Sequence, residues 1–206
     1  MNKSTLFTKG LFVENPLLIM SIGICPAIIG AKTVQLGLVL GIVVIVILFL
    51  STTIINLLKK FVSDRTEQFL IIVLTAGFAT LASLVIKAVF PELYDELILA
   101  MALLSINCIL IETLTFYPRN YSFFENIMHT MGTGIGYLIG LILIGAFREL
   151  FTAGTIWGVE IVPVAILHGE TFFQTVPGGL FIIALIMAFS RWISNKIKRR
   201  SKGIWQ

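Results

Sequence analysis

The chain has 206 residues, of which 57% are hydrophobic and only 13% are charged. A water-soluble domain is about 45–50% apolar and about 25% charged, so this composition excludes an ordinary soluble protein and indicates an integral membrane protein. The formal net charge of +4 is small and spread among apolar stretches, so we expect no binding to nucleic acid.

Six apolar stretches of the chain are candidates for membrane-spanning helices, because a helix needs about 20 mainly apolar residues to cross a bilayer. They run from Pro16 to Lys32, Leu36 to Leu58, Phe69 to Val89, Leu97 to Thr115, Thr130 to Phe147, and Gly178 to Ile197. The first stretch lacks a clear cleavage site and is followed by five more, so we expect no removable signal peptide. The sequence therefore predicts an all-α integral membrane protein with six transmembrane helices, folded as a single membrane domain over residues 1–206.

The first and fourth stretches are the shortest, and they contain the only two cysteines, Cys25 and Cys108, each near the middle of its stretch. Pro26 follows Cys25 directly and lacks an amide hydrogen, so we expect a helix break at Cys25–Pro26 and a second break near Cys108. Interrupted helices in matching positions of two halves are typical of inverted repeats with a site at the bilayer midplane. Three spans are an odd number, so the second half would enter the membrane from the opposite face. We therefore expect an inverted 3+3 repeat, with repeat one over about 12–90 and repeat two over about 91–197.

The distribution of basic residues predicts the orientation of these spans. With both termini in the cytoplasm, twelve of the 15 lysines and arginines lie on the inner side, and only Lys32, Lys87 and Arg148 lie toward the outside. We therefore expect a multi-pass protein of the prokaryotic cytoplasmic (inner) membrane with cytoplasmic N- and C-termini. The basic C-terminal tail, residues 196–206, ends the sixth helix and lies near lipid headgroups.

The connection after the fifth stretch is long and reaches about Pro177. It contains the apolar run Val159–Leu167, which is too short to span and predicts a re-entrant or interfacial segment. Arg148 and Glu149 close the fifth stretch. Charges at such a boundary usually pair with each other or reach water, and the alternative is a contact to a neighbouring subunit on the outer face.

The two cysteines have three interpretations. A cysteine inside an apolar segment is most often a small core residue. A Cys25–Cys108 disulfide is a second option, and metal ligation by the two thiolates is a third. Iron–sulfur clusters and structural zinc take four ligands, and neither His129 nor His168 lies near the cysteines in the sequence. Metal ligation would therefore need two further ligands, which a second chain with two similar cysteines would supply for a 2Fe–2S cluster.

Several blocks along the chain resemble the NqrD/RnfE family of integral membrane subunits, in order and in spacing. These blocks are Glu14–Pro16, Gly23–Pro26, Ile106–Ile111, Gly132–Tyr137, Gly145–Phe151 and Gly158–Glu160. The pairing of cysteine with proline and the short tail are closer to the RnfE type than to NqrD. The resemblance covers nearly the whole chain.

The resemblance implies a subunit of an Rnf or Na⁺-NQR complex, in which electron transfer is coupled to Na⁺ or H⁺ transport. It implies that Cys25 and Cys108 bind the iron of an intramembrane 2Fe–2S cluster, shared with a paralogous subunit of opposite topology (RnfA or NqrE type). Flavins and further iron–sulfur clusters would lie on neighbouring subunits. No nucleophile–base pair or phosphate loop is present, so we expect the chain to catalyse little alone.

Glu112 lies one helical turn after Cys108, where the sequence departs from the family pattern. This family usually has a Gly-Arg-Ala-Glu-Ala-Phe run at this point, whereas Glu112–Tyr117 stands here. An acid within a span is by default a functional candidate, here for binding a coupling ion or carrying a proton. The alternative is a boundary residue that reaches water or pairs with Arg119.

Two other kinds of protein remain compatible with the sequence. One is a small ion transporter or channel subunit without a redox centre, since inverted repeats are common there. The other is a scaffold subunit, for which the thiols would matter only to assembly. Gly132, Gly134 and Gly136 do not form a dinucleotide fingerprint because they follow no strand; small residues in this helix predict close packing against another helix.

Overall fold

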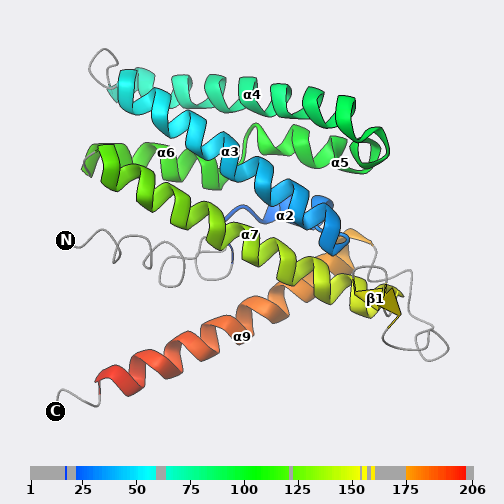
Figure 1. Cartoon of the computed structure of the whole chain (residues 1–206). Helices are drawn as coiled ribbons and strands as arrows, with labels where there is room; N and C mark the ends of the chain where they lie inside the picture. Colours follow the sequence, from blue (N-terminus) through cyan, green and yellow to red (C-terminus); the bar gives the residue numbers. More distant parts are fainter. Residues whose placement is uncertain are drawn as a thin grey trace.

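The computed structural model describes residues 17, 22–58, 64–120, 123–153, 155–156, 159–160 and 175–202. In chain order the elements are α2 (Ile24–Gly30), α3 (Val34–Leu58), α4 (Asp64–Val89), α5 (Pro91–Leu104), α6 (Cys108–Asn120), α7 (Phe123–Ala153), β1 (Thr155–Ile156), β2 (Val159–Glu160) and α9 (Val176–Lys202) (Figure 1). The two strands pair antiparallel, with Thr155 opposite Glu160. The all-α prediction therefore missed this small hairpin, which begins the long connection. Most of Val159–Leu167 lies outside the described residues.

Three helices in the described part of the chain are long and apolar enough to cross a membrane: Val34–Leu58, Thr66–Val89 and Phe123–Leu150. The pair Pro91–Leu104 and Cys108–Thr115, bent by 42°, makes a fourth candidate span if both helices belong to one crossing. This confirms a helical membrane protein. The six-span inverted repeat stays a prediction, because most of Pro16–Lys32 before α2 lies outside the described residues and the apolar part of α9 covers only Val176–Phe189.

The helices α3 and α7 form the central pair and run side by side (Figure 1). They are antiparallel, because residues later in α3 contact residues earlier in α7. A Cβ added at Gly37 would lie 3.0 Å from the Leu141 carbonyl oxygen, and one added at Gly134 would lie 3.0 Å from Ile45. Further along the pair, the Thr52 hydroxyl donates to the Thr130 hydroxyl over 3.4 Å. Small residues thus bring the two backbones together, as the glycines of α7 predict.

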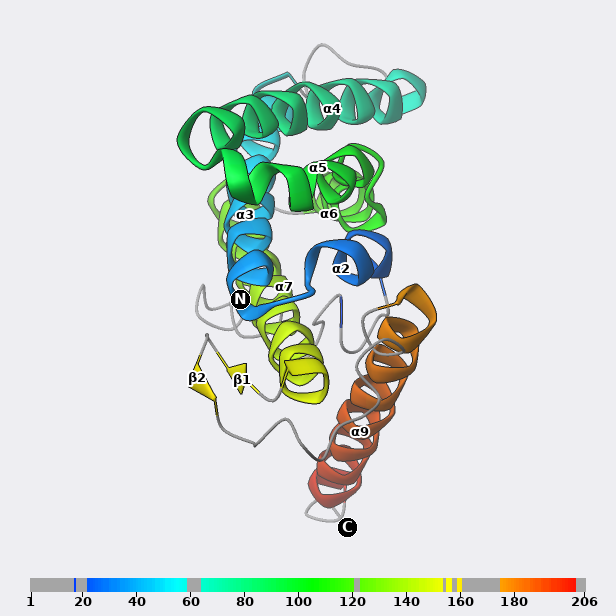
Figure 2. The same ribbon diagram turned by 90° about the vertical axis from the view of Figure 1, so that its right-hand side faces the viewer.

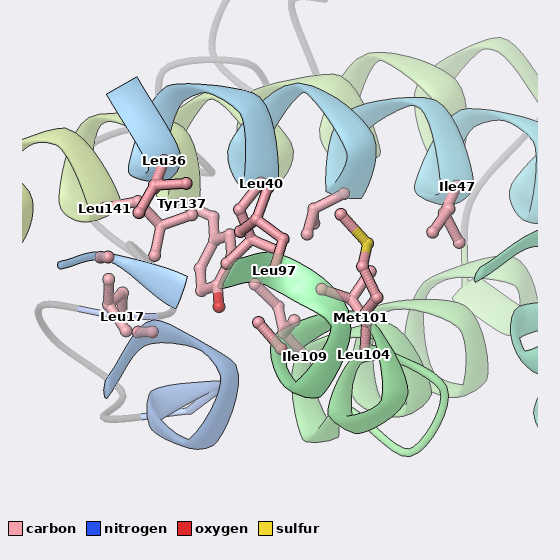
Figure 3. Packing of buried hydrophobic residues seen from close by; sticks show 14 of the residues in the cluster. Leu17, Leu36, Leu40, Ile47, Leu97, Met101, Leu104, Ile109, Tyr137 and Leu141 are labelled. Atoms are coloured by element: carbon pink, nitrogen blue, oxygen red, sulfur yellow. The ribbon is translucent and has the colours of Figure 1, made fainter. Parts of the chain in front are cut away.

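The remaining helices pack around this pair. Short α2 lies between α3 and α5, since a Cβ at Gly30 would meet both Leu40 of α3 and Ala100 of α5. One hydrophobic core joins α2, α3, α5, α6 and α7, with Tyr137 as its largest fully buried side chain (Figure 3). Core packing therefore positions both interrupted segments against the central pair.

The break in the first cysteine segment lies at Gly23 and not at Cys25–Pro26, so that part of the prediction is wrong. Helix α2 begins at Ile24, and Gly23 adopts the left-handed backbone conformation with φ of 80°. Pro26 is the third residue of α2, where its missing N–H removes no helical hydrogen bond. The second break agrees with the prediction, because α5 ends at Leu104 and α6 begins at Cys108.

Arg148 and Glu149 hold the turn between α2 and α3. The Arg148 guanidinium donates to the carbonyl oxygen of Ile28, near the C-terminal end of α2. Glu149 Oε2 accepts the N–H of Val34, the first residue of α3, over 3.0 Å. A cation at a helix C-terminus and an anion at a helix N-terminus both match the local dipole. The predicted anchoring role is therefore carried by backbone contacts to two other helices.

Helix α9 extends away from the bundle (Figure 2). Its start lies against α7, where a Cβ at Gly179 would be 3.2 Å from Arg148 Cζ. Large apolar side chains along it, among them Phe181, Leu185 and Phe189, are exposed. The helix continues to Lys202, so the first part of the basic tail is helical.

Candidate functional site

Cys25 and Cys108 both lie in the first turn of a short helix. Cys25 is the second residue of α2 and Cys108 is the first residue of α6. Both thiols are free and both residues are exposed. The structure therefore does not place either cysteine in the core of this chain, and it contains no Cys25–Cys108 disulfide.

The two helix breaks that precede these cysteines are in contact with each other. A Cβ added at Gly23 would lie 3.3 Å from Oδ1 of Asn107 and 3.4 Å from a methyl group of Ile109. Gly23 is two residues before Cys25, and Asn107 and Ile109 flank Cys108. The fold thus brings together two segments that are more than 80 residues apart in the sequence.

Each break exposes a backbone carbonyl, and each carbonyl accepts a hydrogen bond from a neighbouring helix. The Tyr137 hydroxyl of α7 donates to the carbonyl oxygen of Gly23 over 2.9 Å. The Thr75 hydroxyl of α4 lies 3.3 Å from the carbonyl oxygen of Ser105, to which it donates. Irregular backbone within a membrane is tolerated only when its polar groups are satisfied by the protein. The sequence analysis assigned no role to these two hydroxyls, although a tyrosine and a threonine within apolar spans are the signal that would have found them.

Asn107 is the N-cap residue of α6 and is only 2% exposed. Its side-chain oxygen Oδ1 accepts the N–H of Ile109 over 3.3 Å, which is the usual N-cap hydrogen bond. Its side-chain nitrogen Nδ2 is buried and has no hydrogen-bond partner in the protein. A buried donor without a partner is rare and calls for an explanation. Sequence reasoning quoted Asn107 as part of a motif but gave it no function.

Glu112 lies in α6, one turn after Cys108, and is half-buried. Within the described residues, no hydrogen bond or ion pair of its carboxylate is found. The side chain of Arg119, which the sequence suggested as its partner, lies outside the described residues. Glu112 is therefore near the candidate site but not shown to take part in it.

No group of three or more His, Cys, Asp or Glu side chains gathers as a metal site in the part of the chain that the structure describes. His129 is buried in α7 at a hydrogen-bonding distance of 3.3 Å from the Thr133 hydroxyl. A metal centre at the two cysteines would therefore need ligands from a second chain.

The sequence model of the Rnf-Nqr subunits, described as membrane proteins, matches residues 3–189. The chain belongs to the Rnf-Nqr family. This confirms the family resemblance, and the match covers both cysteine segments and the whole central helix pair.

Several members of the Rnf-Nqr family align with nearly the full chain. The component designated E of the proton-translocating ferredoxin:NAD(+) oxidoreductase complex of Clostridium ljungdahlii is 30% identical, over 96% of this chain and 92% of its own length. The component with the same letter in the Na(+)-translocating ferredoxin:NAD(+) oxidoreductase complex of Acetobacterium woodii is 25% identical, over 95% of this chain and its full length. The component designated D of the Na(+)-translocating NADH-quinone reductase of Chlamydia pneumoniae is 29% identical, over 92% of this chain and 91% of its own length.

Proposed function

We propose that this chain is a membrane subunit of an ion-translocating electron transport complex of the Rnf type, a ferredoxin:NAD⁺ oxidoreductase. Within it, Cys25 and Cys108 would supply two of the four ligands of an intramembrane 2Fe–2S cluster. The observation that carries the proposal is the contact between the two helix breaks, which brings two segments with free, exposed thiols together. The names of the aligned relatives support the choice of complex.

The chemistry of the residues present fits such a cluster. Thiolates are the preferred ligands of iron–sulfur clusters. A thiolate alone in the membrane would be costly, whereas iron compensates its charge. The unpartnered N–H donor of Asn107 directly precedes Cys108, and a cluster sulfur is a suitable acceptor for it. When bound, the cluster would accept and return one electron at a time.

The two missing ligands would come from a paralogous RnfA or NqrE type subunit of opposite topology. Ile106, beside the second break, is 71% exposed, and both cysteines are exposed too. Such a surface is suited to contact with another membrane protein. Flavins and further iron–sulfur clusters on neighbouring subunits would deliver electrons to this position and remove them.

The inverted 3+3 repeat remains part of the proposal. Under that repeat, the second span corresponds to the fifth and the first to the fourth. In the structure the second and fifth pack antiparallel as α3 and α7, and Gly23, in the first, contacts the break in the fourth. Contacts between equivalent spans are those expected near an internal twofold axis. We further propose cytoplasmic termini in a prokaryotic inner membrane, on the basis of the positive-inside distribution.

Glu112 is proposed as a residue for ion or proton coupling. It lies one turn after a proposed iron ligand, and a carboxyl group at membrane depth responds to a change of charge nearby. The aligned relatives are named for proton translocation in one case and Na⁺ translocation in another, so the family does not specify the ion.

The proposal is tested by purifying the complete complex with Cys25→Ser, with Cys108→Ser, and with Ala102→Ser as a control on an exposed position of α5. We expect each cysteine variant to lose one iron–sulfur signal in low-temperature EPR, together with about two iron atoms per complex. Electron transfer between ferredoxin and NAD⁺ should fall at least about 100-fold, as for loss of an essential redox ligand. Full iron content and undiminished electron transfer in both variants would favour a transporter subunit without a redox centre.

A further inference from the structure

We infer that the side-chain amide of Asn107 donates an N–H hydrogen bond to a sulfur atom of the proposed cluster and thereby raises its reduction potential. This inference rests on the proposed function, because it requires a cluster at Cys25 and Cys108. It goes further by giving a tuning role to a residue that is not itself a ligand.

The orientation of the amide follows from its capping role. Because Oδ1 accepts the N–H of Ile109, the two N–H donors of Nδ2 lie on the other side of the amide group. The side chain is almost completely buried, so bulk water does not reach these donors freely. Nδ2 nevertheless has no partner within the protein. A buried amide in an apolar environment loses free energy without a partner, so the site implies an acceptor that the chain does not provide.

The position of Asn107 limits what that acceptor can be. The residue lies where the two breaks touch, next to Cys108 in the chain and against Gly23, which leads into the turn that bears Cys25. A side chain at position 23 would press on Asn107, so the absence of one keeps this junction close. An acceptor bound between the two cysteines would therefore lie beside the amide.

The expected effect on the cluster has a definite sign. Reduction adds one negative charge, and a hydrogen-bond donor stabilises that charge more in the reduced form than in the oxidised form. Loss of the N–H donor should therefore lower the reduction potential. Asn107 would act as a positioning and tuning residue, since it neither binds iron nor transfers the electron.

Replacement of Asn107 by serine separates the two roles of the side chain. Serine is as good an N-cap as asparagine, so the N-terminus of α6 remains capped, but its short hydroxyl does not replace the amide donors. In Asn107→Ala both the cap and the donors are lost. Asn56→Ser is the matched control, because Asn56 Nδ2 is also buried and unpartnered. Its partner Asn126 lies eleven residues, or about 16 Å, along α7 from Tyr137.

The measurement is an EPR-monitored redox titration of the purified complex, following the signal that disappears in Cys25→Ser. We expect Asn107→Ser and Asn107→Ala to keep the iron content and to lower the midpoint potential by about 59 mV, which equals a tenfold change in the one-electron equilibrium. Asn56→Ser should leave the midpoint unchanged. An unshifted midpoint in Asn107→Ser, or a shift confined to Asn107→Ala, would overturn the inference, since the latter would mark a capping effect.

A second measurement needs no variant and so does not depend on folding. Pulsed EPR of the wild-type complex labelled with ¹⁵N in the asparagine side chains should detect a weak coupling between the reduced cluster and one nitrogen. If the signal is present without such a coupling, the inference is wrong while the proposed function stands. If no signal depends on Cys25, the proposed function fails and the inference with it.

Discussion

Gly23 is the residue on which the geometry of the candidate site depends most. Its φ of 80° lies in the left-handed region, which costs a residue with a side chain about 1–2 kcal/mol. Its Cα faces the ring of Tyr137, where an added Cβ would lie 3.1 Å from Cε2. Glycine is therefore required twice, once for the backbone conformation that starts α2 and once for the contact with α7.

Gly23→Ala should destabilise the protein by about 1–3 kcal/mol, because the left-handed conformation and the close contacts act in the same direction. The measurement is thermal unfolding of the purified complex in detergent. Gly77→Ala is the control: Gly77 lies in helix α4 with no atom within 4 Å of an added Cβ, so alanine there should be neutral or stabilising. Equal stability of the two variants would contradict the importance of the Gly23 conformation.

At the scale of the elements, the ends of helices decide the arrangement more than their middles. Arg148 and Glu149 are adjacent in α7, yet each binds the end of a different helix, α2 in one case and α3 in the other. The hydroxyls of Tyr137 and Thr75 bind the carbonyls that the two breaks leave free. Polar side chains inside the bundle thus satisfy backbone groups that cannot reach water.

Replacement of Glu149 distinguishes its capping role from a simple surface charge. Glu149→Leu leaves the N–H of Val34 without its side-chain acceptor and should lower stability by about 1–3 kcal/mol. Glu149→Gln keeps a carbonyl oxygen that can accept the same hydrogen bond, so we expect it to retain most of the stability. Thermal unfolding of the two variants in parallel gives the comparison, and a glutamine variant as unstable as the leucine variant would show that the negative charge dominates.

At the scale of the whole molecule, the antiparallel pair of α3 and α7 forms the framework. Close contacts at Gly37, Gly41, Gly134 and Gly145 and the polar pairs Thr52–Thr130 and Asn56–Asn126 follow one register along both helices. Short α2 and the bent α5–α6 pair lie on this framework, and their breaks meet. The two cysteine segments therefore owe their proximity to a pair of helices that contains neither cysteine.

The register of this pair predicts a specific cross-link. Thr52→Cys combined with Thr130→Cys should form a disulfide on mild oxidation, because the two hydroxyl oxygens are 3.4 Å apart and a disulfide needs Cβ atoms within about 3.5–4.5 Å. Mass spectrometry of a non-reduced digest would identify the joined peptides. Thr53→Cys with Thr130→Cys is the control, since the Thr53 hydroxyl instead donates to the Phe49 carbonyl within its own helix. Efficient cross-linking of the control pair would contradict the register.

Composition and local residue type were enough to predict a helical membrane protein, its family and two interrupted segments that carry the only cysteines. These features depend on the apolarity of each stretch and on short-range effects of proline, glycine and asparagine, which are readable along the chain. Even so, the first break was assigned to Pro26 instead of Gly23, because a proline in the first turn of a helix has the same local sequence as a proline that interrupts one.

Only the tertiary structure decided which groups meet. The contact of Gly23 with Asn107, the hydrogen bond from Tyr137 to the Gly23 carbonyl and the binding of Arg148 and Glu149 to two other helices each join residues more than 80 positions apart. In a bilayer any apolar helix face packs almost equally well against lipid or protein, so hydrophobic pattern alone does not select a neighbour. Small residues that permit close approach, and backbone groups that must be satisfied away from water, make that selection, and both act through partners that the chain order does not reveal.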